Sequence, residues 1–283
     1  MSQRPLLFSA AAEHTFVVSV DFAAEDGPAQ VTVGLVVGAE SALLIDTGST
    51  PAQGRMLRQA AAAVTPVPLT TVVLTHWHYD HTFGLAGSGA TTSIAHESVR
   101  DRLTGAATAA EAERLGLDRD ALALPNRQVA VVAAIDLGGG VRAEAVHLGR
   151  GHTDGDLVVV VPGSDVVFAG DLVESAGPPQ YGPDSFPHEW PATLDGLIGL
   201  TTERTIVLAG HGGPMDREAV FEQRGRIAAV SGEISRLAGL GVGADDAATR
   251  GDWALPFDAI RAGYEAGRAQ ARGSRSSREL PLV

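Results

Sequence analysis

The N-terminal part of the chain alternates short apolar runs with turns rich in glycine, proline and acidic residues, which is typical of β-strands. Residues 14–22 and 31–48 form two such runs, and an acidic turn at Glu25–Pro28 separates them. The second run contains a polar, glycine-bearing break at Gly38–Ser41. We therefore predict two strands here, the second folding back on itself as a hairpin.

A helix is predicted over Thr50–Val64, because the helix-start signals and the apolar spacing agree. Thr50 suits the N-cap position, and Pro51 suits the first helical position. A short apolar run, Leu69–Thr75, follows and reads as a strand that ends at a cluster of histidines.

The rest of the chain mixes strand and helix patterns. The predicted strands cover residues 91–99, Val129–Val132, Val141–Leu148 and Thr205–Ala209, together with a hairpin around Pro162–Asp165. The predicted helices cover Ser98–Leu117, Pro191–Leu200, Asp216–Leu240 and Pro256–Ala271. The Arg/Ser-rich tail, residues 272–283, is expected to be frayed.

Strand-rich halves with interleaved helices predict a mixed α/β layered sandwich with the helices outside. No low-complexity linker divides the chain. We therefore expect a single domain over residues 1–283, with C-terminal helices attached from about residue 216.

Composition narrows the possible functions. With 45% hydrophobic and 19% charged residues, the 283-residue chain can build a sizeable core. A net charge of -13 argues against a nucleic-acid partner. The chain contains no lysine and no cysteine, which excludes lysine Schiff bases, disulfides and thiolate-bound zinc. No apolar run approaches the ~18 residues of a membrane span, so we expect a cytoplasmic protein without a membrane partner.

Four residues of types that bind metals follow the strand at Leu69–Thr75. His76, His78, Asp80 and His81 fall within six residues, and such polar groups behind a buried strand are costly unless something binds them. His76 and His78 are two residues apart and could share one ion, whereas Asp80 and His81 point elsewhere and could begin a second site.

Three further candidate ligands, His152, Asp171 and His211, follow later strands and lie close to glycines, where the backbone can turn sharply. Imidazoles with carboxylates and no thiolate suit Zn²⁺ first, with Fe or Mn also possible. Seven groups are too many for one tetrahedral ion. They fit two ions roughly 3.5–4 Å apart, as in two-metal hydrolases.

The motifs His-X-His-X-Asp-His, Gly-His-Thr, Gly-Asp and Gly-His, in this order, resemble those of the metallo-β-lactamase fold superfamily. The resemblance extends from "LLIDTG" to "GHGGP", residues 43–214. It implies an αββα sandwich with the site at one edge of two sheets. It also implies a ligand set: His76, His78 and His152 for the first metal, Asp80, His81 and His211 for the second, and Asp171 as the bridge.

Within this superfamily, the absence of cysteine excludes the lactamase type that has a cysteine zinc ligand. Residues 170–197 resemble the SoxH-like group of bacterial zinc metallohydrolases. The implied function is a dinuclear zinc-dependent hydrolase of a small carbonyl substrate (an ester, lactone, thioester or lactam), acting through a metal-bridging hydroxide. Asp80 is the candidate catalytic residue, which would orient the hydroxide and pass a proton to the leaving group.

A second reading is a mononuclear-iron oxygenase similar to the persulfide dioxygenases of the same superfamily, which would use His76, His152 and Asp171. A third is a non-catalytic binding protein, which the intact ligand set disfavours. In each case the partner is a small molecule, and the sequence carries no signal of oligomeric state.

Three aromatic residues are candidates for substrate contact. Trp77 and Tyr79 lie between the ligands and could line the mouth of the site or pack under the loop. Tyr181, in the Pro/Gly-rich loop 175–190, could donate to an oxyanion, as a tyrosine does in some lactonases of this superfamily. The aromatic residues of this loop form either a specificity wall or its own packing: Tyr181, Phe186, His188 and Trp190.

Several polar residues near the ligands have two readings each. Asp46 either supports the metal loop or forms a turn. Thr153 and Asp156 either orient His152 or bond within their loop. Arg150 either meets an anionic substrate or is solvated. We expect structural roles for the remaining histidines of the strands, His14, His96 and His147.

Overall fold

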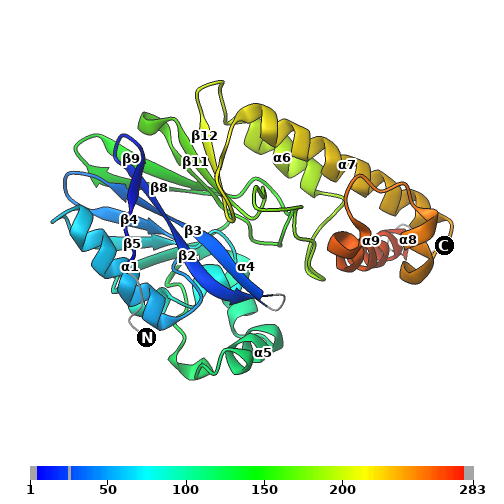
Figure 1. Cartoon of the computed structure of the whole chain (residues 1–283), viewed down its shortest axis with the longest axis horizontal. Coiled ribbons are helices and arrows are strands. Elements are labelled where there is room, and N and C mark those ends of the chain that lie inside the picture. The colour runs from blue at the N-terminus through cyan, green and yellow to red at the C-terminus, as the bar shows by residue number, and fades with distance from the viewer. Residues whose placement is uncertain (1–4, 25–26, 277–283) are drawn as a thin grey trace, which may run out of the picture.

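The computed structural model describes residues 5–24 and 27–276, with side chains described as far as residue 271. Two β-sheets form the centre of the molecule, and helices cover both outer faces (Figure 1). This is the αββα arrangement expected from the sequence.

The first sheet contains seven strands in sequence order. They are Ser9–Ala12 (β1), Thr15–Ala24 (β2), Gly27–Val37 (β3), Ala42–Ile45 (β4), Leu69–Val73 (β5), Thr92–His96 (β6) and Arg127–Val129 (β7). The second sheet has the order β13-β12-β11-β10-β9-β8. Its strands are Val132–Gly138 (β8), Val141–Val146 (β9), Val158–Val161 (β10), Val166–Gly170 (β11), Ile206–Ala209 (β12) and Pro214–Met215 (β13).

Helices lie on the two outer faces. The first sheet is covered by Pro51–Val64 (α1), Tyr79–Thr82 (α2), Leu85–Ser88 (α3), Glu97–Leu103 (α4) and Ala106–Arg114 (α5). The second sheet is followed by Trp190–Gly199 (α6), Arg217–Gly239 (α7), Ala244–Arg250 (α8) and Phe257–Ser276 (α9). In Figure 1, α8 and α9 lie at the far end of α7, away from α1. No helix within the described ranges combines the length and the apolar character that crossing a bilayer requires.

The central strands are apolar on both faces because both faces are covered. Along β11, Val167 faces α6 and α7, whereas Phe168 faces the first sheet. Along β5, Val72 faces the outer helices and Val73 faces the second sheet. Side chains that alternate between two buried environments give continuous apolar runs, and these runs made the strands recognisable in the sequence.

Most predicted elements are confirmed, including the helix whose N-cap is Thr50, with a side chain that accepts from Gln53 N. Predictions were wrong in three regions of the chain. In the first region, the strand expected over residues 91–99 ends at His96, and α4 follows directly. The helix expected over Ser98–Leu117 is two helices, α4 and α5, separated at Thr104–Gly105. The strand expected over Val129–Val132 is not a single strand, since β7 ends at Val129 and β8 runs from Val132 to Gly138. The alternation of β8 is weak in the sequence because its first inward residue is a small alanine, Ala133.

The third region is the C-terminus, where helix α9 runs to Ser276, beyond the predicted end at Ala271. The first five residues of the tail expected to be frayed, 272–276, are therefore helical, and residues 277–283 lie outside the described part. Helix α8 was not foreseen, because its seven residues carry a single buried side chain, Ala247.

Candidate metal centre

The first four candidate ligands lie where β5 ends. Strand β5 pairs in parallel with both β4 and β6, so its C-terminal end is held at the centre of the sheet. His76 and His78 occupy the loop after the strand, and Asp80 and His81 lie on the short helix α2. His76, Asp80 and His81 are buried, which is costly for such groups without a partner.

The other three candidates come from the second sheet. His152 follows β9, Asp171 follows β11, and His211 follows β12. Strands β11 and β12 are parallel, so Asp171 and His211 leave the sheet at the same edge. Gly210 makes this approach possible, since a Cβ there would lie 1.8 Å from Oδ1 of Asp171.

In the first group, three imidazole nitrogens and one carboxylate oxygen converge. Nδ1 of His78 lies 3.1 Å from Nε2 of His76 and 2.9 Å from Nε2 of His152. Oδ2 of Asp171 lies 3.7 Å from Nε2 of His76 and 3.5 Å from Nε2 of His152. All four ligand atoms lie within 4.8 Å of one another, close enough to share one ion.

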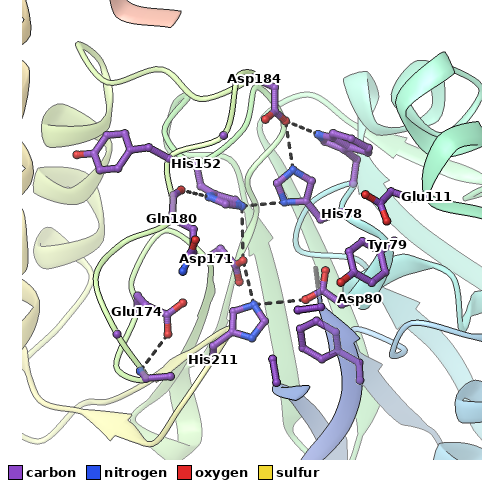
Figure 2. Close-up of a pocket in the computed structure, with 18 of the residues that line it drawn as sticks. His78, Tyr79, Asp80, Glu111, His152, Asp171, Glu174, Gln180, Asp184 and His211 are labelled. Atoms are coloured by element: carbon purple, nitrogen blue, oxygen red, sulfur yellow. Dashed lines mark hydrogen bonds and ion pairs between the residues drawn. The ribbon is translucent and has the colours of Figure 1, made fainter. Parts of the chain in front are cut away.

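A second group lies on the other side of Asp171. Oδ2 of Asp80 is 3.5 Å from Nε2 of His81 and 3.4 Å from Nε2 of His211. The carboxylate of Asp171 lies 3.2 Å from each of the same two nitrogens. Asp171 therefore touches both groups, and Figure 2 shows it between His152 and His211. All seven residues expected to be ligands are brought together.

The outer ring nitrogens of four histidines are held by acceptors. Nδ1 of His152 lies 2.9 Å from the carbonyl of Gln180, and Nδ1 of His211 lies 2.7 Å from the carbonyl of Gln30. A carbonyl only accepts hydrogen bonds, so each Nδ1 carries a proton and each Nε2 is the nitrogen left to face the centre of the cluster. The carboxylates of Asp46 and Asp184 hold His81 Nδ1 and His78 Nε2 in the same way.

The donor set fits divalent cations. Nε2 of His81 and Oδ1 of Asp171 are buried and have no hydrogen-bond partner among the described residues. Lone pairs of neighbouring imidazoles face one another at hydrogen-bond distance, which is unfavourable unless a proton or a cation lies between them. Imidazole nitrogens with carboxylate oxygens are the ligands of zinc sites that lack thiolate.

The members of the cluster differ in how their surroundings shift their pKa values. Burial lowers the pKa of His152 to about 4, so this imidazole is neutral at ordinary pH. Burial also opposes protonation of His211, but the Asp171 carboxylate outweighs it and raises the pKa of His211 to about 10. Burial would raise the pKa of Asp171, but His211, His81 and His76 hold it well below its usual value. Asp171 therefore carries a negative charge at the centre of the cluster, where the sequence predicts a carboxylate shared by two cations.

A cavity of about 1370 Å³ opens over these groups. It exceeds the ~300–1,000 Å³ typical of small-molecule sites, so a bulky substrate has room. The predicted substrate contacts Trp77, Tyr79 and Tyr181 all line it. Trp77 is buried, and its indole nitrogen donates to Asp184 at 2.7 Å.

The three aromatic residues differ in how they are held. Tyr79 packs edge-on against Phe22, with ring centroids 5.8 Å apart. Tyr181 packs against Trp190, and its buried hydroxyl has no partner within the described part of the chain. Burial raises the pKa of Tyr181, so the hydroxyl stays protonated and can donate.

The remaining members of the 175–190 loop have separate positions. Phe186 lines the cavity. Trp190 is fully buried and donates to the carbonyl of Leu172, while His188 contacts Ser231 on α7 and the carbonyl of Gly267 on α9. His188 therefore fixes the loop to α7 and α9, and Trp190 fixes it to the segment that follows β11.

The polar residues with two readings also have definite positions. The carboxylate of Asp156 accepts from the backbone and hydroxyl of Thr153, which is hydrogen bonding within the loop. Arg150 pairs with Glu189 at 2.5 Å and stacks over Phe186. Asp46 has the supporting role, because it holds His81 and accepts from Thr75.

Two residues of the cavity were missed in the sequence. Asp184 connects Trp77 to His78, and Glu174 lies in the wall beside His211 (Figure 2). Burial, followed by the nearby Asp171 carboxylate, raises the pKa of Glu174 to about 7. Neither residue belongs to a spaced motif. The only signal was the polar, Pro/Gly-rich composition of the loop that begins near Asp171.

A family model described as the Metallo-beta-lactamase superfamily matches residues 26–211. The match covers more than half of the chain, and the side chains that converge here, from His76 to His211, lie within it. The protein therefore belongs to the metallo-beta-lactamase superfamily.

Two curated relatives carry the name "Metallo-beta-lactamase type 2". The one from Bacillus sp. (strain 170) is 26% identical over 146 residues, which are 51% of this chain and 52% of the relative. The one from Bacteroides fragilis is 25% identical over 181 residues, 63% of this chain and 67% of the relative. The chain thus spans about half the length of the first of these relatives.

Solved structures have the same fold. A metallo-beta-lactamase from Pontibacter korlensis has a TM-score of 0.66 at 20% identity, over 79% of this chain and 99% of that one. The structure of TMB-1 also gives 0.66, at 21% identity, over 81% of this chain and 99% of that one. At these identities the likeness concerns the fold alone.

Proposed function

We propose that this protein is a dinuclear, zinc-dependent hydrolase of a small carbonyl substrate: an ester, lactone, thioester or lactam. The observation that carries the proposal is the pair of ligand groups on either side of Asp171. A mononuclear oxygenase would need only His76, His152 and Asp171. The second group of Asp80, His81 and His211 is equally convergent, and this favours two ions.

In this proposal His76, His78 and His152 would hold the first ion, Asp80, His81 and His211 would hold the second, and Asp171 would be a ligand shared by both. Two divalent cations supply a water of lowered pKa and polarise a carbonyl. The chain contributes the geometry, since the outer hydrogen bonds of the histidines fix which nitrogen faces the centre.

Asp80 is the residue that we propose for proton transfer. It lines the cavity as well as facing His81 and His211, so its carboxylate can reach a substrate bound there. Its oxygen would accept a proton from the attacking water and return it to the leaving group. Trp77, Tyr79 and Tyr181 are proposed to contact the substrate, with Tyr181 as a hydroxyl donor toward the carbonyl oxygen.

The fold supports one further part of the proposal, that residues 1–283 act as a single domain. Tyr264 of α9 and Val220 of α7 share a continuous core with Val167 of β11. The kinship with the SoxH-like metallohydrolases rests on residues 170–197 and remains a prediction.

The test is hydrolysis of matched esters, lactones, thioesters and lactams by zinc-loaded protein, with Asp80→Asn as the diagnostic variant. We expect hydrolysis of at least one class, and a fall in kcat of about 100-fold or more in the variant. Asp195→Asn, at an exposed aspartate paired with Arg224, is the matched control. Oxygen uptake with persulfides by iron-loaded protein, without hydrolysis, would contradict the proposal.

A further inference from the structure

Part of the cavity wall beyond the ligands is aromatic. Phe22, Trp77, Tyr79 and Phe186 all line it. Tyr79 and Trp77 are held in place, the first by Phe22 and the second by Asp184. Rigid aromatic surfaces bind apolar groups with little loss of conformational entropy. The part of a substrate that extends away from the scissile carbonyl can therefore pack against an apolar surface.

The described part of the wall offers no lysine and no unpaired arginine to a substrate. The chain contains no lysine. Arg102 is the single arginine among the described residues that line the cavity, and its guanidinium is committed to both oxygens of Asp154. A guanidinium paired in this way has little capacity left for a second carboxylate.

The wall does offer an uncompensated carboxyl group. Glu111 lines the cavity but is paired with Arg114 at 2.8 Å. Glu174 also lines the cavity, and its side chain accepts a hydrogen bond from the backbone nitrogen of Ala176 through one oxygen. Glu174 lies beside His211, on the side of the site away from Asp184 (Figure 2). A carboxylate-bearing substrate would thus approach a like charge in the wall and find no unpaired arginine there.

We propose that this cavity selects acyl compounds whose remaining part is uncharged and apolar, and that Glu174 determines this specificity by disfavouring carboxylate-bearing substrates. The inference rests on the proposed hydrolase function and names its substrate class. The charge of two bound cations does not reverse this preference for uncharged substrates. Asp80 and Asp171 offset part of that charge, and a substrate carboxylate placed at the ions would displace the scissile carbonyl.

The experiment compares methyl 4-acetoxybenzoate with 4-acetoxybenzoate, two acetyl esters that differ in one negative charge. Values of kcat/KM for the zinc-loaded protein are measured at pH 8.5, and each is divided by the rate of hydroxide-catalysed hydrolysis of the same ester. We expect the uncharged ester to be favoured by about tenfold or more, the size of a like-charge contact at a hydrated wall.

Glu174→Gln keeps the hydrogen bond to Ala176 and removes the charge, so the preference should fall by about threefold or more. Glu203→Gln, at a 91%-exposed side chain before the start of β12, is the control and should leave the preference unchanged. Ala107→Arg places a cation on the cavity-lining face of α5 and should raise kcat/KM for the carboxylate ester.

A binding measurement separates this inference from the proposed function. Calorimetry with the matching amides, methyl 4-acetamidobenzoate and 4-acetamidobenzoate, gives the same comparison without turnover. Preferred binding of the uncharged amide without hydrolysis of either ester would support the selectivity and show that the proposed hydrolase does not act on these esters. Equal or better use of the carboxylate ester, a preference unchanged by Glu174→Gln, or binding of neither amide would overturn the inference.

Discussion

Oδ2 of Asp46 lies 2.8 Å from Nδ1 of His81, and this contact fixes the orientation of a residue at the centre of the site. The two Asp46 oxygens also accept hydrogen bonds from the backbone and the hydroxyl of Thr75. Asp46 itself adopts φ 63°, a left-handed conformation that few side chains favour. The chain thus accepts local strain where the strand β4 ends in order to place this carboxylate.

Asp46→Asn should weaken zinc binding at the second group. The amide nitrogen would face a donor at either Thr75 or His81, and facing His81 it would favour the tautomer that removes the Nε2 lone pair. We expect a loss of affinity of about 10- to 100-fold for one of two ions. Competition against a chromophoric chelator measures it. Two unchanged dissociation constants would refute this role of Asp46.

Asp184→Asn should weaken the first group. Oδ2 of Asp184 accepts from the indole of Trp77 at 2.7 Å and lies 3.3 Å from Nε2 of His78, so an asparagine oxygen can replace both contacts but not the negative charge that holds His78. We expect about tenfold weaker binding of the first ion, measured by the same competition. Trp77→Phe is the matched control, because it removes the indole donor but leaves the contact of His78. If Trp77→Phe weakens binding as much as Asp184→Asn does, Asp184 does not act through His78.

Glu174 should make the stability of the metal-free protein depend on pH. Burial and the Asp171 charge raise its folded pKa from 4.5 to about 7, so the folded state holds a proton that the unfolded state has released. The free energy of unfolding contributed by this residue is therefore full below pH 4.5 and falls as the pH rises toward 7.

The total change attributable to Glu174 is about 3 kcal/mol. Urea unfolding between pH 4 and pH 8 checks it, with the wild type losing that amount relative to Glu174→Gln. Asp156, whose pKa burial also raises to about 7, is present in both proteins and cancels in the comparison. Parallel stability curves for the two proteins would show that Glu174 does not titrate in this way.

Metal removal should lower the melting temperature. Ions that bind only the folded state stabilise it by about 4 kcal/mol when their free concentration is 1,000 times the dissociation constant. For a chain of this size that corresponds to about 10 °C. Differential scanning calorimetry with zinc and with chelator measures the shift. An unchanged melting temperature would mean that the cluster holds no ion.

The fold was predictable where a strand is buried on both faces, because such a strand is a continuous apolar run in the sequence, as in β10 and β11. The ligands were predictable because His76, Asp171 and His211 all follow such strands directly or after a short loop. The pattern was weaker in β8, where Ala133 and Ala134 alternate in burial but not in residue type. The spacing of apolar residues alone therefore does not predict the full length of this strand.

The residues that surround the ligands could not be predicted. Asp184 and Glu174 act through contacts made across the fold, Asp184 with Trp77 and His78 from another sheet. The acceptors of His152 and His211 are backbone carbonyls of Gln180 and Gln30, which any residue would supply. No residue type marks such positions, because their chemistry arises only after the chain has folded.

The metal content of the protein tests the central claim most directly. Mass spectrometry of protein purified without added metal or chelator, and again after zinc loading, gives the number of ions per chain. We predict two zinc ions per chain in the loaded wild type and one in His211→Ala. Removing the imidazole of His211 should leave the group of His76, His78 and His152 intact. One iron per chain, or no zinc uptake at all, would contradict the dinuclear zinc centre proposed here.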